Sequence, residues 1–189
     1  MFGAVGFAAI EPELFRPLKR AEYDRLVELG LFQGERIELL RGVLVKMLPQ
    51  RPPHASTVQK LNGLLAARLQ ERFGLRIRCP LALSDDSEPE PDVAIVSPGD
   101  YDTEHPRTAL LVIEVADSSQ PIDRGIKLTI YAEADVPEYW IVDLVQMTVD
   151  VHTQPKRGRY TNLRTFRDGD VLRPTLLPDV AIYVAEIPR

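Results

Sequence analysis

Two strongly apolar segments of this 189-residue sequence each carry a carboxylate where a buried strand would normally have none. The first is "PDVAIV" at 91–96, which contains Asp92, and the second is "LLVIEVA" at 110–116, which contains Glu114. Side chains of a strand alternate between its two faces, so Glu114 shares a face with the apolar residues at 110, 112 and 116. A buried charge costs free energy unless it is paired or bound. The pattern therefore predicts two core strands whose acids serve a site.

These two acids have an electrostatic reason to share a cation if their strands are neighbours. Two carboxylates about 4 Å apart repel by about 4 kcal/mol at an effective dielectric constant of about 20. Either one acid keeps a proton or a cation lies between them. Two hard oxygen ligands, completed by water and a substrate phosphate, suit Mg²⁺. The structural alternative is that Glu114 pairs with an arginine and Asp92 caps the start of its strand.

A lysine after the second strand is the candidate base of the same site. The segment "SSQPIDRGIKLTIYAEADVPEYW" predicts a helix over about 119–134. At about 100° per residue, Arg124, Lys127 and Tyr131 share one stripe, and the isoleucines at 122, 126 and 130 form a neighbouring apolar stripe. This helix can carry Lys127 back toward Glu114, where an ammonium would orient a water or offset charge on a phosphate. A solvated helix lysine is the alternative.

The remaining sequence predicts an α/β or α+β domain with a mixed sheet. Helical spacing indicates helices over 17–29 and over "PPHASTVQKLNGLLAARLQERFG", the latter with a capping box from Ser56 to Gln59 and an end at Gly74. Two short strands within 36–48 turn at Arg41-Gly42. A hairpin and a final strand are predicted near the C-terminus, and other strands at 75–83, 91–97, 109–116 and 138–144.

Composition indicates a single domain, 17–189, preceded by an N-terminal arm, 1–16. The arm has an apolar run without basic residues that is too short to cross a bilayer, so we expect no export signal and no membrane insertion. The single cysteine excludes an internal disulfide, and a reducing, cytoplasmic location is expected. The net charge of −5 argues against tight, sequence-blind nucleic-acid binding as the main function.

Several motifs in one order resemble a known family. They are "IELLRG" at 37–42, "PDVAIV" at 91–96, "LVIEVADSS" at 111–119 and "DRGIKLTIYAEADVPEYWIVD" at 123–143. This order resembles the Uma family of putative restriction endonucleases, within the PD-(D/E)XK nuclease superfamily. The resemblance implies a restriction-endonuclease-like core, a mixed β-sheet flanked by helices, and one site for Mg²⁺ or Mn²⁺.

The resemblance also implies a role for each matching residue. Asp92 and Glu114 match the two motif acids, and the backbone carbonyl of Val115 would join them as a metal ligand. Two residues after the second acid, where the superfamily usually has lysine, this chain has alanine. The resemblance therefore implies that the lysine is Lys127, supplied by the following helix. Glu38 matches the N-terminal acid of the family, a further ligand or a group that positions water.

Three more residues are candidates for contact with the substrate or for support of the site, namely His54, Arg124 and Tyr131. His54 begins a helix, where the helix dipole would favour a phosphate, and structural capping is the alternative. For Tyr131 the alternative is core packing.

The leading hypothesis is a metal-dependent endodeoxyribonuclease, a hydrolase that cuts DNA. Two subunits would be needed to cut both strands at once, so a homodimer is expected. The rival hypothesis is a nuclease fold that no longer cuts and serves as a nucleic-acid-binding or regulatory module. The set of Asp92, Glu114 and Lys127 favours the enzyme, because a protein that does not cut has no reason to keep such costly charges in its core.

Overall fold

The structure is a computed structural model that describes residues 14, 16–117 and 119–187. Of the arm predicted at 1–16, positions 1–13 and 15 lie outside the described residues. Within the described ranges, every helix is too short or too polar to cross a bilayer.

Six strands form the central sheet in the order β3-β4-β5-β6-β7-β8. β5 and β6 run parallel, and the other neighbouring pairs are antiparallel. The strands are β3 (Gly74–Ile77), β4 (Val93–Val96), β5 (Leu111–Ala116), β6 (Glu138–Asp143), β7 (Thr148–Lys156) and β8 (Arg159–Phe166). The predicted mixed sheet is thus confirmed, and its central strands β4, β5 and β6 are buried along their whole length.

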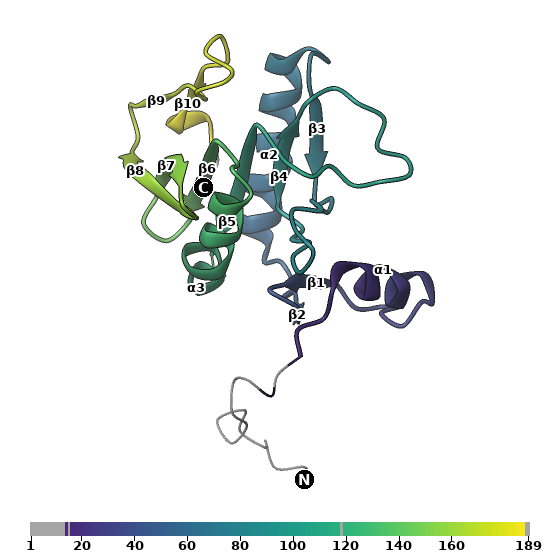
Figure 1. Ribbon diagram of the computed structural model, residues 1–189. Helices are drawn as coiled ribbons and strands as arrows, with labels where there is room; N and C mark the ends of the chain where they lie inside the picture. Colours follow the sequence, from purple (N-terminus) through teal and green to yellow (C-terminus); the bar gives the residue numbers. More distant parts are fainter. Residues whose placement is uncertain (1–13, 15, 118, 188–189) are drawn as a thin grey trace.

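Helices cover both faces of the sheet, as Figure 1 shows, with α2 behind it and the α3–α4 segment in front. α2 (Pro52–Leu69) packs its leucines into a core cluster that includes Ile113 and Trp140. On the other face, Tyr131 and Tyr139 belong to a second cluster. The segment on that face consists of α3 (Gln120–Ile122), a π-helical turn η3 (Asp123–Lys127) and α4 (Leu128–Glu133).

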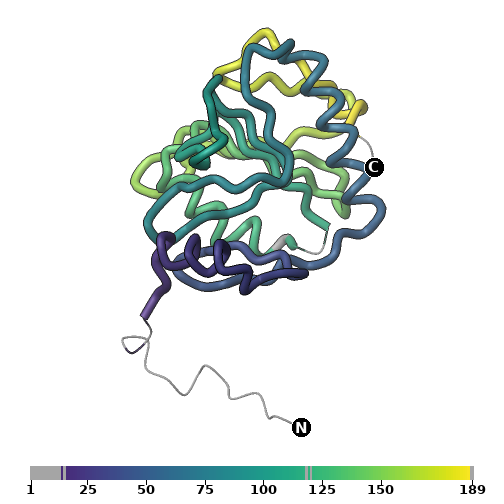
Figure 2. The backbone as a smooth tube through the Cα atoms, turned by 90° about the vertical axis from the view of Figure 1, so that its right-hand side faces the viewer, coloured from purple at the N-terminus to yellow at the C-terminus, as the bar shows by residue number. Residues whose placement is uncertain are grey.

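A small N-terminal unit lies at one end of the molecule, opposite the C-terminal strands (Figure 2). It consists of α1 (Arg20–Glu28) and the antiparallel hairpin of β1 (Ile37–Leu40) and β2 (Val43–Lys46). The C-terminal end is formed by β9 (Val171–Leu172), β10 (Ile182–Tyr183) and the 3-10 turn η4 (Val184–Glu186).

The predicted turn of the N-terminal hairpin is confirmed at Arg41 and Gly42, whose φ angles are 54° and 73°. A side chain on Gly42 would collide with Pro17, so glycine is required there both for its backbone angle and for space. Leu39 forms a β-bridge with Glu88, in the segment that leads into β4. This bridge fixes the hairpin and therefore the position of Glu38.

The boundaries of α2 differ from the prediction. The helix begins at Pro52, so the predicted capping box of Ser56 and Gln59 is wrong, because both residues lie inside the helix. Proline at the first helical positions lacks only a backbone donor that has no helical partner there, which allows this earlier start. The helix ends at Leu69, the following residue Gln70 caps it in a left-handed conformation with φ 49°, and Gly74 belongs to β3.

The π-helical turn η3 interrupts the helix predicted over 119–134. A π-bulge adds a residue to one turn and changes which side chains face inward. Ile130 is buried as predicted, but Ile126 is 37% exposed, so the predicted isoleucine stripe is wrong at that position. Asp123 and Lys127 are buried instead.

Glu88 provides a test of the fold that does not involve Asp92, Glu114 or Lys127. Burial raises the pKa of Glu88 from 4.5 to about 7, Asp24 adds to the shift, and Arg20 opposes it. Above pH 4.5 this carboxyl group ionises more readily in the unfolded chain than in the folded protein. The free energy of unfolding should therefore fall as the pH rises from 4.5 to 7. Glu88→Gln should therefore stabilise the protein by about 2 kcal/mol more at pH 8 than at pH 4.5. Urea unfolding of both proteins measures this, and a pH-independent difference would contradict it.

Candidate active site

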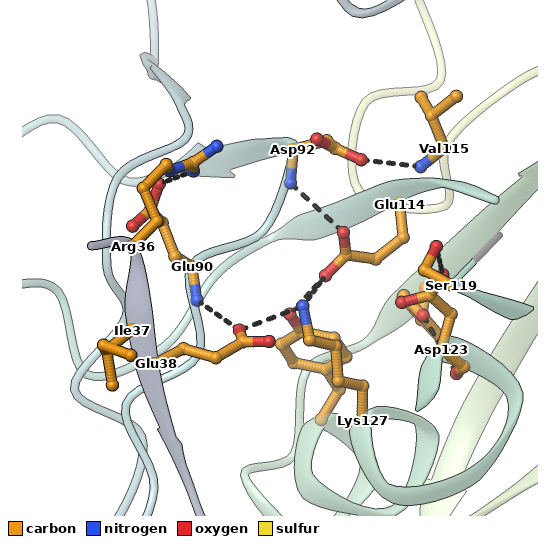
Figure 3. A network of polar contacts seen from close by, with 12 residues as sticks. Arg36, Ile37, Glu38, Glu90, Asp92, Glu114, Val115, Ser119, Asp123 and Lys127 are labelled. Carbon is orange, nitrogen blue, oxygen red and sulfur yellow. Dashed lines mark hydrogen bonds and ion pairs between the residues drawn. The ribbon is translucent and has the colours of Figure 1, made fainter. Parts of the chain in front are cut away.

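Asp92 and Glu114 lie opposite each other at the junction of β4 and β5. The antiparallel register pairs Val93 with Ile113. The residue before Val93, Asp92, therefore lies beside the residue after Ile113, Glu114. The backbone N–H of Asp92 donates to Glu114 Oε2 at 3.3 Å. The N–H of Val115 donates to Asp92 Oδ2 at 2.9 Å (Figure 3). Because β4 begins only at Val93, the Asp92 side chain here supplies the acceptor that a backbone carbonyl of a paired strand would otherwise supply. The local fold therefore forces both carboxylates into one place.

Lys127 connects this pair to the N-terminal hairpin. Its Nζ lies 3.0 Å from Glu114 Oε1 and 3.0 Å from Glu38 Oε2. The hydroxyl of Tyr131 donates to the same Glu114 oxygen at 2.9 Å. Glu38 Oε2 also accepts the backbone N–H of Glu90 at 3.1 Å, which fixes its orientation. Glu114 and Lys127 are each only 4% exposed, so this is a buried network and not a surface ion pair.

Asp123 is a buried member of this region that the sequence analysis missed. It lies one turn before Lys127 on η3, accepts a hydrogen bond from the Ser119 hydroxyl, and lines the same cavity as Lys127. Its backbone oxygen accepts the hydroxyl of Tyr139 at 3.1 Å, which anchors η3 to β6. The available signal was an acid four residues before the lysine, a spacing that brings side chains together on a helix.

The electrostatics of the network follow from burial. Burial raises the pKa of Glu114 well above its ordinary value, although the ammonium of Lys127 opposes the shift. Burial also raises the pKa of Asp123 to about 6. Burial acts to lower the pKa of Lys127, but the charges of Glu114 and Glu38 outweigh it and raise that pKa, so the lysine is protonated at neutral pH. Carboxyl groups outnumber ammonium groups here, and the raised pKa values of Glu114 and Asp123 mean that these acids resist ionising together without a further cation.

The network opens into a cavity of about 110 Å³. His54 and Gln50 reach Asp92 from the wall of this cavity, with His54 Nε2 at 3.1 Å from Oδ2 and Gln50 Nε2 at 3.2 Å from Oδ1. Basic side chains form part of the rim, each paired with an acid: Arg36 with Glu90, Lys46 with Glu35, and Arg51 with Asp117.

The structure thus brings together most of the residues named from the sequence. Asp92, Glu114, Lys127 and Glu38 line one cavity with His54, and Tyr131 contacts it through Glu114. Arg124 lies elsewhere: its guanidinium binds Asp143 and Asp150 at 2.9 and 2.6 Å and is not part of the cavity wall. Ordinary α-helical spacing predicts that Arg124 and Lys127 lie on the same side of the helix, but the π-helical turn changes this spacing and directs Arg124 elsewhere. Gln50 and Glu90, on the loop before α2 and in the segment before β4, had no distinctive sequence signal.

The backbone of Val115 faces the same junction. The carbonyl of the next residue, Ala116, accepts the N–H of Leu144 on the β6 side. Successive residues of a strand direct their backbone groups to opposite sides, and the N–H and C=O of one residue share a side. Because the Val115 N–H reaches Asp92, its carbonyl also faces the β4 side, beyond the end of that strand.

Comparison with known proteins identifies the family of the chain. The model of the Uma2 family, described as "Putative restriction endonuclease", matches residues 20–185. The chain belongs to the Uma2 family. The resemblance inferred from the sequence motifs is therefore confirmed, and the Uma2 match spans every element that lines the cavity.

A solved structure supports the fold of this Uma2 protein. A putative nuclease belonging to DUF820 from Anabaena variabilis ATCC 29413 superimposes with a TM-score of 0.70 and 14% identity, covering 90% of this chain and 97% of that one. At this identity the likeness concerns the fold. No functionally curated protein matches the chain.

Proposed function

We propose that this Uma2-family protein is an endonuclease that hydrolyses phosphodiester bonds of DNA with a divalent metal bound at Asp92 and Glu114. The observation that carries the proposal is the buried Asp92–Glu114 pair with Lys127 in direct contact with Glu114. The two acids accept the backbone N–H groups of Val115 and Asp92, which need an acceptor but not a charge. A nuclease requires all three charged groups.

The donor set fits a hard cation. Within the described ranges, no group of three or more His, Cys, Asp or Glu side chains is arranged to hold a metal ion. Asp92 and Glu114, with the carbonyl of Val115, instead offer three oxygen donors, and Mg²⁺ and Mn²⁺ complete such a set with water and phosphate oxygens. A cation in the same place would allow these buried acids to ionise together. When bound, the metal lowers the pKa of a coordinated water and offsets charge on the phosphate.

The protein side chains would carry out the other tasks. Lys127, protonated and fixed between two carboxylates, donates hydrogen bonds to the attacking water or to the phosphate as its charge develops. Tyr131 holds one oxygen of Glu114 in place, so that the carboxylate does not rotate. Glu38 holds Lys127 from the opposite side and would position water in the cavity. Direct attack by water would invert the configuration at phosphorus.

A cleavage assay tests the proposed function. Supercoiled plasmid and branched or single-stranded DNA are incubated with the wild-type protein in Mg²⁺ or Mn²⁺, with EDTA and the Asp92→Asn variant as controls. We expect cleavage that requires the metal and is lost in the variant. Linear product formed directly from plasmid would support a homodimer. Binding of DNA without any cleavage would favour the non-cutting module.

Arg51 allows a test of how DNA approaches the cavity. It precedes α2 at the cavity rim, is 67% exposed, and binds both oxygens of Asp117 at 3.2 Å. We expect Arg51→Gln to weaken DNA binding in EDTA about fivefold, because one phosphate contact is lost. The slope of the logarithm of the binding constant against the logarithm of salt concentration should become shallower by about 1. Arg25, 66% exposed and paired with Glu28, is the matched control outside the cavity. Equal effects of Arg51→Gln and Arg25→Gln would reject this approach.

A further inference from the structure

A second cavity, of about 450 Å³, lies between α1 and the loop 103–107. Its wall shares no residue with the candidate active site. α1 supplies one side of the cavity, and Glu88 lies in its wall together with Pro80 and Ala82. A cavity of this size is large enough for a small organic molecule or a long side chain.

The charges that line this cavity are mostly compensated. Arg20 donates to Asp24 at 3.1 Å, and Arg107 lies 3.5 Å from Glu104. The remaining acid of α1 in the wall, Glu28, pairs with Arg25 at 2.8 Å. One lining carboxylate has only a longer ion pair, at 3.7 Å.

That carboxylate is Glu88. It is 5% exposed, and its Oε2 accepts no hydrogen bond from any described residue. The nearest cation is Arg20 Nη1 at 3.7 Å, which is already bonded to Asp24. Burial lowers the pKa of His105, so this lining residue adds no positive charge at neutral pH. A buried acceptor left in this state costs free energy that a donor from outside would recover.

Part of the cavity wall is apolar. Val27 of α1 lines the cavity and is half exposed, and Pro80 and Ala82 face the same space. The ring of Tyr23 also forms part of the wall. An aliphatic chain would bury apolar surface here, and a short polar molecule would not.

We propose that this cavity binds an alkylammonium or alkylguanidinium group, with its charged end at the Glu88 carboxyl group and its stem against Val27, Pro80 and Ala82. The group can come from a free polyamine-like molecule or from a lysine or arginine side chain of a protein partner. Cation binding at this site is additional to DNA cleavage and independent of it.

Calorimetric titration at pH 8 tests the proposal with two probes. Agmatine represents the free cation, and an acetylated, amidated pentapeptide with one central arginine between glycines represents the partner side chain. We expect wild type to bind agmatine, and Glu88→Gln to bind it at least about tenfold more weakly, since a hydrogen bond to a charged group is lost. Glu28→Gln, which changes another lining acid, should alter the affinity less than about twofold.

Each outcome decides the proposal. Glu88-dependent binding of agmatine alone supports a free cation as ligand, and equally Glu88-dependent binding of the peptide supports a protein partner. Absence of binding by both probes, or equal binding by wild type and Glu88→Gln, overturns the proposal. Circular dichroism of Glu88→Gln confirms that the fold is retained, as expected for a substitution that removes a buried charge.

Discussion

Replacing Lys127 with methionine is expected to abolish DNA cleavage while the variant binds Mn²⁺ more tightly than the wild type. Removing a positioned charge that stabilises the transition state costs about 10³-fold in rate. The gain in metal affinity has a different cause. Lys127 occupies Glu114 Oε1 and Glu38 Oε2 at 3.0 Å, so the ammonium competes with any other cation for these carboxylates. Without it, a bound metal can take over the balance of their charge.

Cleavage rates and calorimetric titration with Mn²⁺ in the absence of DNA measure the two effects separately. Loss of one partner from a buried ion pair costs about 3 to 5 kcal/mol, so the metal-free variant should also unfold at lower denaturant concentration, and Mn²⁺ should restore part of the loss. Lys60→Met, at an exposed position of α2 outside the cavity wall, is the control. Cleavage within a few-fold of wild type, or weaker metal binding by Lys127→Met, would contradict the assigned role.

Glu114→Gln is expected to lose both metal binding and cleavage. The substitution keeps the shape of the side chain but removes the charge, and an amide presents only one oxygen to a metal. We expect the affinity for Mn²⁺ to fall at least about 100-fold, in line with a loss of about 3 kcal/mol. Calorimetric titration of the variant beside wild type measures it.

Glu138 supplies the matched control for this substitution. It is a buried glutamate on β6, next to β5, but it accepts hydrogen bonds from Trp140 Nε1 and from the N–H of Thr175 and lies outside the cavity wall. Glu138→Gln should bind Mn²⁺ as the wild type does, whatever its effect on stability. Equal binding by Glu114→Gln and wild type would remove Glu114 from the metal site.

Much of the site could be predicted from sequence because strand alternation is a local property. The position of Glu114 among apolar neighbours and the acid at the start of the preceding strand were enough to predict a shared site. Helical spacing made Lys127 the candidate for the third member, and the resemblance to the Uma family implied the same residue. All three are found in one buried cavity, and Lys127 is in contact with Glu114.

The parts that were missed depend on contacts between distant segments or on irregular backbone. The π-helical turn at Asp123–Lys127 has no reliable sequence signature, so Arg124 was expected beside Lys127. Asp123 was overlooked although its spacing from Lys127 was a signal. The contact of Lys127 with Glu38 depends on how the N-terminal hairpin docks through Leu39 and Glu88. The start of α2 was misplaced because the capping pattern at Ser56 competed with the prolines before it, and the prolines decided the boundary.

A crystal of the protein soaked in Mn²⁺ tests the central claim most directly, because anomalous scattering locates the ion without reference to activity. We predict one strong peak at the junction of β4 and β5, in contact with carboxylate oxygens of Asp92 and Glu114. Well-diffracting crystals with saturating Mn²⁺ and no peak at this junction, or with a peak that remains there in Glu114→Gln, would contradict the account.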